Sequence, residues 1–307
     1  GTGPLRKAIV SFYVAHGQEQ NLIQGLFAQE FNATDDLTLL LRVDSAATRV
    51  FTAFIFVCCK QWLSDVLLPV VRGILDEKQL KDTDVPPATS LKLAGLLFNE
   101  IQKVSASAPA DLCAILSWLA KEIKERYSSA MVAPLLSNLL LLRTVNPLII
   151  NPTALLDTPP WNSSQRRIAL AVTKNVMETL RYINQEGERV SKSDEEKEVR
   201  TSSPGKRPEG LPASLSSSAG QVVLPSMLSW AVLYNMSLET IVASSNRQSA
   251  AIARPPSFTG SAAVAASMST ICGFITANTK AMVKDPRVSF VMADLLSTAL
   301  SDVQFKK

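Results

Sequence analysis

The chain has 307 residues, of which 47% are hydrophobic and 19% charged, and its formal net charge at pH 7 is +4. This composition supplies a substantial apolar core, and a mild charge without a basic and aromatic cluster argues against a nucleic-acid partner. One histidine and four cysteines without metal-ligand spacing favour neither a zinc site nor a histidine-dependent triad, so we expect no metal and no cofactor.

Apolar residues at helical spacing open the chain and continue through residues 5–30. A single helix is predicted over about 46–74, where apolar residues again recur every three or four positions. Asp44 or Ser45 can cap this helix, because both side chains accept hydrogen bonds from free backbone N–H groups. Arg42 is therefore expected in a short, stiff loop directly before a capped helix.

Two amphipathic helices are predicted next, over residues 91–104 and 112–127, after a polar connector at 76–90. Asp111 is a plausible N-cap for the second of them, because an aspartate there can accept a hydrogen bond from the first turn. Trp118 on the second of these helices is assigned to the core.

A leucine-rich segment follows, with Pro134 suited to the first turn of a helix. Because nearly every residue in it is apolar, the helix is expected to be buried on all sides. The Asn-Pro pair at 146–147 is expected to end it near Thr144 or Val145, since a residue before proline avoids helical geometry. Arg143 falls in the last turn, where a buried guanidinium needs acceptors such as the free carbonyls of a nearby loop.

A further helix is predicted over 166–183, followed by a change in composition. Residues 185–221 are rich in Glu, Lys, Ser, Gly and Pro and are predicted to form a disordered insertion. Helical patterns resume over 222–243 and again over 263–280 and 287–304. No strand pattern of period two competes with the helices, so the sequence predicts an all-α fold.

Two segments carry a resemblance to a known family. Residues 40–49 read LLRVDSAATR and residues 141–152 read LLRTVNPLIINP. In this order they resemble the two motifs of Ras GTPase-activating domains. The first motif is a Leu-Phe-Arg followed by Asn-Ser, a small residue and Ala-Thr or Ala-Ser. The second is a Phe-Leu-Arg followed by Asn-Pro-Ala-Ile and another proline.

The resemblance implies one large helical RasGAP-like domain over residues 1–307. Its catalytic core would occupy residues 5–184, and the C-terminal helices residues 222–307, on the other side of the insertion. Arg42 would be the arginine finger, which the family inserts into the active site of Ras. Arg143 would hold the finger loop.

The resemblance also implies a surface that binds the GTPase. The helix over 166–183 would line the groove for the switch regions of Ras, but Met177 replaces a family glutamine and Arg181 a family asparagine. The positions expected to contact the GTPase are Thr38, Leu41, Leu142, Asn146, Pro147, Asn151, Lys174, Met177 and Arg181. No metal site is implied.

No glycine-rich phosphate-binding motif is present in the chain, so we expect an activator that is not itself an enzyme. Its partner would be a GTP-loaded small GTPase of the Ras family, or a relative such as Rap. The alternatives are a non-catalytic Ras/Rap-family GTPase-binding module, or a helical scaffold in which Arg42 is an ordinary solvated arginine. We expect a cytoplasmic location without a direct membrane span, and membrane recruitment through regions outside this sequence.

Overall fold

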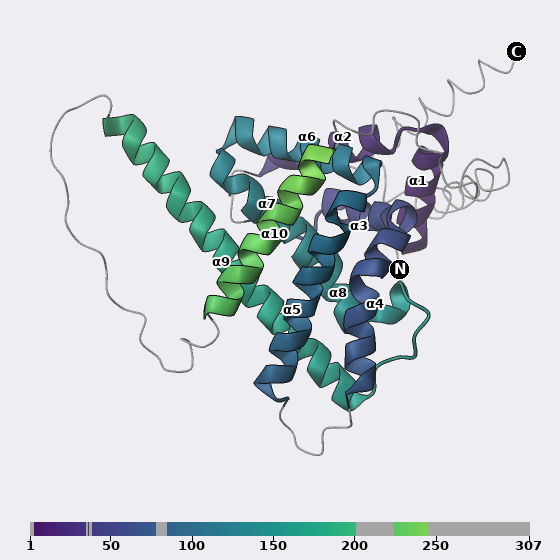
Figure 1. Cartoon of the computed structure of the whole chain (residues 1–307). Coiled ribbons are helices and arrows are strands. Elements are labelled where there is room, and N and C mark those ends of the chain that lie inside the picture. The colour runs from purple at the N-terminus through teal and green to yellow at the C-terminus, as the bar shows by residue number, and fades with distance from the viewer. Residues whose placement is uncertain (1–2, 35, 37–38, 78–84, 201–223, 245–307) are drawn as a thin grey trace, which may run out of the picture. The chain divides into compact units, whose positions relative to one another are not determined.

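The computed structural model describes residues 3–34, 36, 39–77, 85–200 and 224–244 (Figure 1). Within these ranges the structure is helical and contains no strand, which confirms the all-α prediction. The chain divides into two compact units, of which one includes α1 (Gly3–His16) and the other spans residues 19–253.

α1 ends with a glycine in the left-handed region: Gly17 has a φ of 70°. The N–H of Gln18 donates to the carbonyl of Tyr13 at 2.9 Å, a pairing typical of a helix C-terminus. The ring Nδ1 of His16 lies 2.8 Å from the carbonyl of Phe12, so the histidine contributes to the end of its own helix.

The elements of the second unit are short helices and turns around a few long helices. In chain order they are α2 (Glu19–Ala33), α3 (Ala46–Cys58), α4 (Lys60–Asp76), α5 (Pro87–Val104), η1 (Ser105–Ser107), α6 (Ala110–Arg126), η2 (Ser129–Met131), α7 (Val132–Ser137), η3 (Asn138–Val145), α8 (Asn146–Ile150), η4 (Pro152–Ala154), α9 (Ser163–Arg200) and α10 (Leu224–Ser244).

The core of this unit is built around α5, which packs against α4, α9 and α10 (Figure 1). Phe98 of α5 stacks on Trp230 of α10 with ring centroids 5.7 Å apart, and it meets Tyr234 edge-on at 6.1 Å. A Cβ added at Gly95 would lie 3.2 Å from the Trp230 ring, so this glycine permits the close approach of α10. α10, which lies close to the helix predicted over 222–243, therefore completes the core.

The helix predicted over about 46–74 is in fact two helices, so that prediction is wrong. α3 and α4 meet at Cys59, where the two axes bend by 88°. Cys59 is fully buried and has a φ of −114° and a ψ of 16°, outside the helical region. Both helices bury apolar faces, so the periodic pattern continues across a break that no glycine or proline marks.

α5 and α6 lie close to their predicted positions, but the predicted cap is wrong. α6 begins at Ala110, its N-cap is Pro109, and no side chain caps it. Asp111 already lies in the first helical turn, where it accepts a hydrogen bond from Gln20 Nε2 at 3.3 Å. The carboxylate therefore links α6 to α2.

The leucine-rich segment does not end before Pro147, so that prediction is also wrong. Asn146 keeps helical geometry, with a φ of −58° and a ψ of −46°, and α8 follows η3 directly. The reason is that η3 is a π-helix, in which the N–H of Asn146 donates to the carbonyl of Leu141, five residues back. The hydrogen bonds of this wide turn already differ from the α-helical pattern, so the helix can accommodate the missing N–H of Pro147.

The segment Ser129–Ile150 is long and apolar enough to cross a bilayer by length and composition. However, 72% of its most apolar window is buried inside the fold, as in a core helix. α3 and α4 pass the same test only if taken together as one bent span.

α9 is longer than predicted. It runs to Arg200, so the insertion does not begin at residue 185. Gly187 packs against Pro134 and Ala130, and strong helix formers such as Glu and Lys fill the remaining turns. The rest of the predicted insertion and the helices predicted over 263–280 and 287–304 lie outside the described residues.

Gly187→Ala tests whether α9 packs here. In an open helix this change would stabilise by about 1 kcal/mol. Here the new Cβ would lie 2.3 Å from Pro134 Cγ and 2.9 Å from the carbonyl oxygen of Ala130. We therefore expect a destabilisation of about 1–3 kcal/mol in chemical denaturation. The exposed Gln185→Ala is the control and should change little; a more stable Gly187→Ala would contradict this packing.

Candidate functional site

The segment 39–45 between α2 and α3, called here the Arg42 loop, is a tight turn. The N–H groups of Arg42 and Val43 both donate to the carbonyl of Leu39, at 3.0 Å each. Leu41 has a φ of 56°, in the left-handed region, and its side chain is fully buried. Because this conformation costs a non-glycine residue about 1–2 kcal/mol, contacts around the loop must hold it.

A capping box fixes the end of the loop to α3. Ser45 is the N-cap: its Oγ accepts from the N–H of Thr48 at 3.1 Å, and its own N–H donates to Thr48 Oγ1 at 3.0 Å. This confirms the predicted cap and selects Ser45 over Asp44. Thr48 Oγ1 also lies 3.1 Å from the carbonyl of Val43, so the cap reaches back into the loop.

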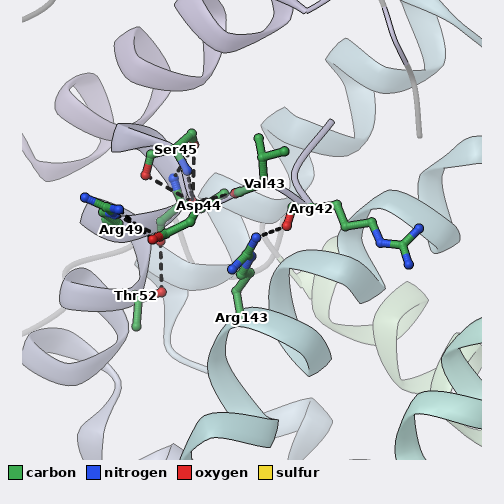
Figure 2. A network of polar contacts seen from close by, with 8 residues as sticks. Arg42, Val43, Asp44, Ser45, Arg49, Thr52 and Arg143 are labelled. Carbon is green, nitrogen blue, oxygen red and sulfur yellow. Dashed lines mark hydrogen bonds and ion pairs between the residues drawn. The ribbon is translucent and has the colours of Figure 1, made fainter. Parts of the chain in front are cut away.

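Arg143 joins the loop to η3. Its Nη2 donates a hydrogen bond to the main-chain carbonyl of Arg42, across 101 residues of sequence (Figure 2). The loop carbonyl expected as a partner of Arg143 is therefore present. Arg143 is half-buried and not fully buried, and its buried Nε has no hydrogen-bond partner among the described residues.

The side chain of Arg42 extends away from Arg143 (Figure 2). It is exposed, and its guanidinium makes no hydrogen bond or ion pair with any residue that the structure describes. The main chain of this residue is thus held while its cation remains open to solvent. Such a guanidinium can donate several hydrogen bonds to an incoming anion and stays charged at any physiological pH.

Asp44, two residues after Arg42, does not pair with it. Its carboxylate forms a bidentate ion pair with Arg49, with Nε–Oδ1 and Nη2–Oδ2 distances of 2.8 and 2.5 Å. Both side chains are about half exposed, so the pair contributes little to stability. Its effect is to neutralise the carboxylate nearest to Arg42 in sequence.

Glu30 of α2 lies beneath the loop. Its Oε1 accepts a hydrogen bond from the N–H of Leu41 at 3.2 Å, and its Oε2 accepts one from Ser45 Oγ. Only 8% of Glu30 is exposed, and burial raises the pKa of its carboxyl, opposed by these hydrogen bonds and by the charge of Arg143. The buried carboxylate thus holds the loop at two points.

Sequence reasoning missed Glu30. A signal for it exists, because Glu30 occupies a core position in the apolar pattern of α2 with Leu26, Phe27 and Phe31, all of them buried. A charged residue at such a position needs a polar partner. The partner itself could not be named, because it lies on a loop beyond the end of the helix.

The residues predicted around Arg143 differ in exposure. Leu142 is half-buried, Asn146 is buried, and Pro147 is exposed. Asn146 Oδ1 is buried without a hydrogen-bond partner among the described residues. Asn151 is exposed and accepts a hydrogen bond from Thr153 at 2.7 Å. Thr38, also predicted to contact the GTPase, lies outside the described residues.

The predicted positions on α9 lie toward solvent. Lys174 and Arg181 are exposed and Met177 is half-buried. Arg181 forms an ion pair with Glu178 at 2.9 Å, one turn away on the same helix. α9 packs against η3 and α8, so these positions belong to a helix adjacent to the element that carries Arg143.

The cysteines of the described residues are poorly suited to act as nucleophiles. Cys58, Cys59 and Cys113 are free, and burial raises the pKa of the first to about 12 and of the last to about 11. Such thiols stay protonated at neutral pH. Across the described ranges, no three His, Cys, Asp or Glu side chains are grouped to hold a metal ion.

No model of a known protein family matches the chain, and no curated protein matches it. The chemistry of the site must therefore be inferred from its own geometry. That geometry is an exposed cation on a loop held by a second arginine, a buried carboxylate and a helix cap.

Arg143→Met tests the link between η3 and the loop. The aliphatic part of the side chain is kept and the hydrogen bond to the Arg42 carbonyl is lost. We expect a loss of about 1 kcal/mol in unfolding free energy and faster amide hydrogen exchange in residues 39–45. Arg189→Met, which removes an exposed arginine paired with Glu186, is the control and should leave exchange in the loop unchanged. Equal loop exchange in the two variants would contradict a holding role.

Proposed function

We propose that the chain is a GTPase-activating domain that stimulates GTP hydrolysis by a small GTPase of the Ras family. Arg42 acts as an arginine finger in trans, and Arg143 stabilises the finger loop. The observation that best supports this proposal is the hydrogen bond from Arg143 to the carbonyl of Arg42, which joins the two motifs that carry the resemblance.

The proposed chemistry is electrostatic. In phosphoryl transfer, negative charge shifts among the oxygens around the transferred group, and a guanidinium placed there stabilises the transition state more than the ground state. For Ras and its activators the arginine contributes about 10³–10⁵-fold in rate, a magnitude that belongs to the class and not to this structure. The open side chain and held main chain of Arg42 suit this role.

The proposed contact surface combines apolar and basic side chains. Leu39 and Val43, on either side of Arg42, are 46% and 37% exposed, although leucine and valine usually lie inside. On α9, Leu170 is 47% exposed and lies one turn before Lys174, on the face that also holds Met177. A partner with an apolar and acidic switch surface would match this combination.

Arg42→Ala tests the central claim in a single-turnover GTP hydrolysis assay against a panel of Ras-family GTPases. The variant should lose the stimulation, equivalent to about 4–7 kcal/mol of transition-state stabilisation for a 10³–10⁵-fold effect. It should still fold and bind the GTP-loaded partner, because the Arg42 side chain has no partner in the described fold. Arg42→Lys keeps a charge but lacks the planar fork, so it should recover little.

Arg72→Ala is the matched control and should retain full stimulation, because this exposed arginine of α4 is separated from the loop by the whole of α3. If Arg42→Ala stimulates within threefold of the unmodified chain, Arg42 is not the finger. If the unmodified chain binds GTP-loaded GTPases without stimulating any of them, the non-catalytic binding module is the correct alternative.

On α9, Met177 and Arg181 differ from the residues that the family has at these positions, which leads to a prediction about partner choice. If this helix faces the GTPase, Met177→Gln with Arg181→Asn restores two amides and removes one cation. The double variant should change the ranking of partners and reduce the salt dependence of association, because a cation near an acidic partner steers the encounter. Catalysis once bound should be unchanged. An unaltered ranking and salt dependence would show that these positions face away from the GTPase.

A further inference from the structure

We propose that Glu30 is a positioning residue for the arginine finger. Its carboxylate holds the N–H of Leu41, the residue before Arg42, while Arg143 holds the carbonyl of Arg42 itself. This inference rests on the proposed function of the loop. Glu30 lies outside both motifs of the resemblance, and its role follows from the contacts of α2 with the loop.

The two contacts enclose the residues that aim the finger. Glu30 Oε1 accepts from the N–H of Leu41, and Arg143 donates to the carbonyl of Arg42. Between these two points lies the left-handed φ of Leu41, which sets the direction in which the chain enters Arg42. If Leu41 relaxed to the common right-handed region, the following residue would be redirected. Holding both ends of this dipeptide therefore fixes the direction in which the Cα–Cβ bond of Arg42 leaves the loop.

The second oxygen of Glu30 connects the loop to the N-cap of α3. Oε2 accepts from Ser45 Oγ, and Ser45 Oγ accepts in turn from the N–H of Thr48. One carboxylate thus ties the left-handed residue and the N-cap of α3 to α2. A carboxylate can do this because each of its two oxygens is an acceptor, whereas an amide has only one accepting oxygen.

Burying the charge of Glu30 lowers the stability of the folded chain. Because burial raises the pKa of Glu30, its ionised form is less favourable in the folded chain than in the unfolded chain, so neutralising it at neutral pH removes that penalty. The same substitutions leave the N–H of Leu41 or the hydroxyl of Ser45 without its acceptor, which costs about 1–3 kcal/mol for each buried group, so the two effects on stability oppose each other. Variants at this position should therefore separate the stability of the fold from the order of the loop.

The test uses Glu30→Gln and Glu30→Met, with two measurements on each. Hydrogen exchange of residues 39–45 should be about three- to tenfold faster in the glutamine variant and faster still in the methionine variant, which has no strong acceptor. Single-turnover stimulation at saturating chain should fall by about tenfold or more, because catalysis is sensitive to shifts of an ångström. The concentration for half-maximal stimulation should change less than threefold, and the melting temperature should stay within about 3 °C.

Glu19→Gln is the matched control. Glu19 is on the same helix and equally buried, with 5% exposed, but it lies about 16 Å away along the helix axis. This variant should leave both exchange in the loop and stimulation unchanged. If it loosens the loop as Glu30→Gln does, the effect belongs to the helix as a whole, and the proposal for Glu30 is wrong.

The two measurements separate this inference from the proposed function. If the unmodified chain stimulates no GTPase, the proposed function fails, and exchange alone decides whether Glu30 holds the loop. If the unmodified chain stimulates and both Glu30 variants match it in exchange or in rate, the positioning role is overturned. A large fall in melting temperature with no selective loosening of residues 39–45 would also overturn it, since Glu30 would then be structural.

Discussion

The left-handed backbone of Leu41 is the constraint around which the candidate site is arranged. A leucine adopts this conformation only when its surroundings impose it, and here the surroundings come from three separate parts of the chain. α2 supplies the carboxylate of Glu30, α3 supplies the cap at Ser45, and η3 supplies the guanidinium of Arg143. The full burial of the Leu41 side chain adds the apolar anchor.

The π-helical geometry of η3 accounts for how a helix buried in the core reaches a surface loop. Each wide turn holds one residue more than an α-helical turn, which shifts the following side chains by about 100° around the axis. Leu139 and Leu141 remain fully buried, while Arg143 lies half-exposed against the Arg42 carbonyl. The same geometry lets the helix continue through Pro147. A regular α-helix ending before the proline would place Arg143 differently.

Sequence pattern predicted the parts of this arrangement that depend on neighbouring residues. The cap at Ser45 and the helix α10 follow from local chemistry and apolar period, and both are present. The break at Cys59 was missed because it depends on how two apolar faces pack, which leaves no local mark. Glu30 was missed for a related reason: its partners lie 11 and 15 residues further along the chain, beyond a turn that no periodicity describes.

Charge pairing around the loop determines what Arg42 can do. Glu30 accepts hydrogen bonds beneath the loop and is stabilised by the charge of Arg143, and Asp44 is neutralised by Arg49. Each of these two carboxylates is therefore already satisfied, and neither competes for the guanidinium of Arg42. An unpaired Asp44 two residues away would attract that guanidinium and hold it against the loop, since opposite charges near a surface attract by about 1–4 kcal/mol. With Arg49 in place, the side chain of Arg42 stays extended and available to an anion supplied by another molecule.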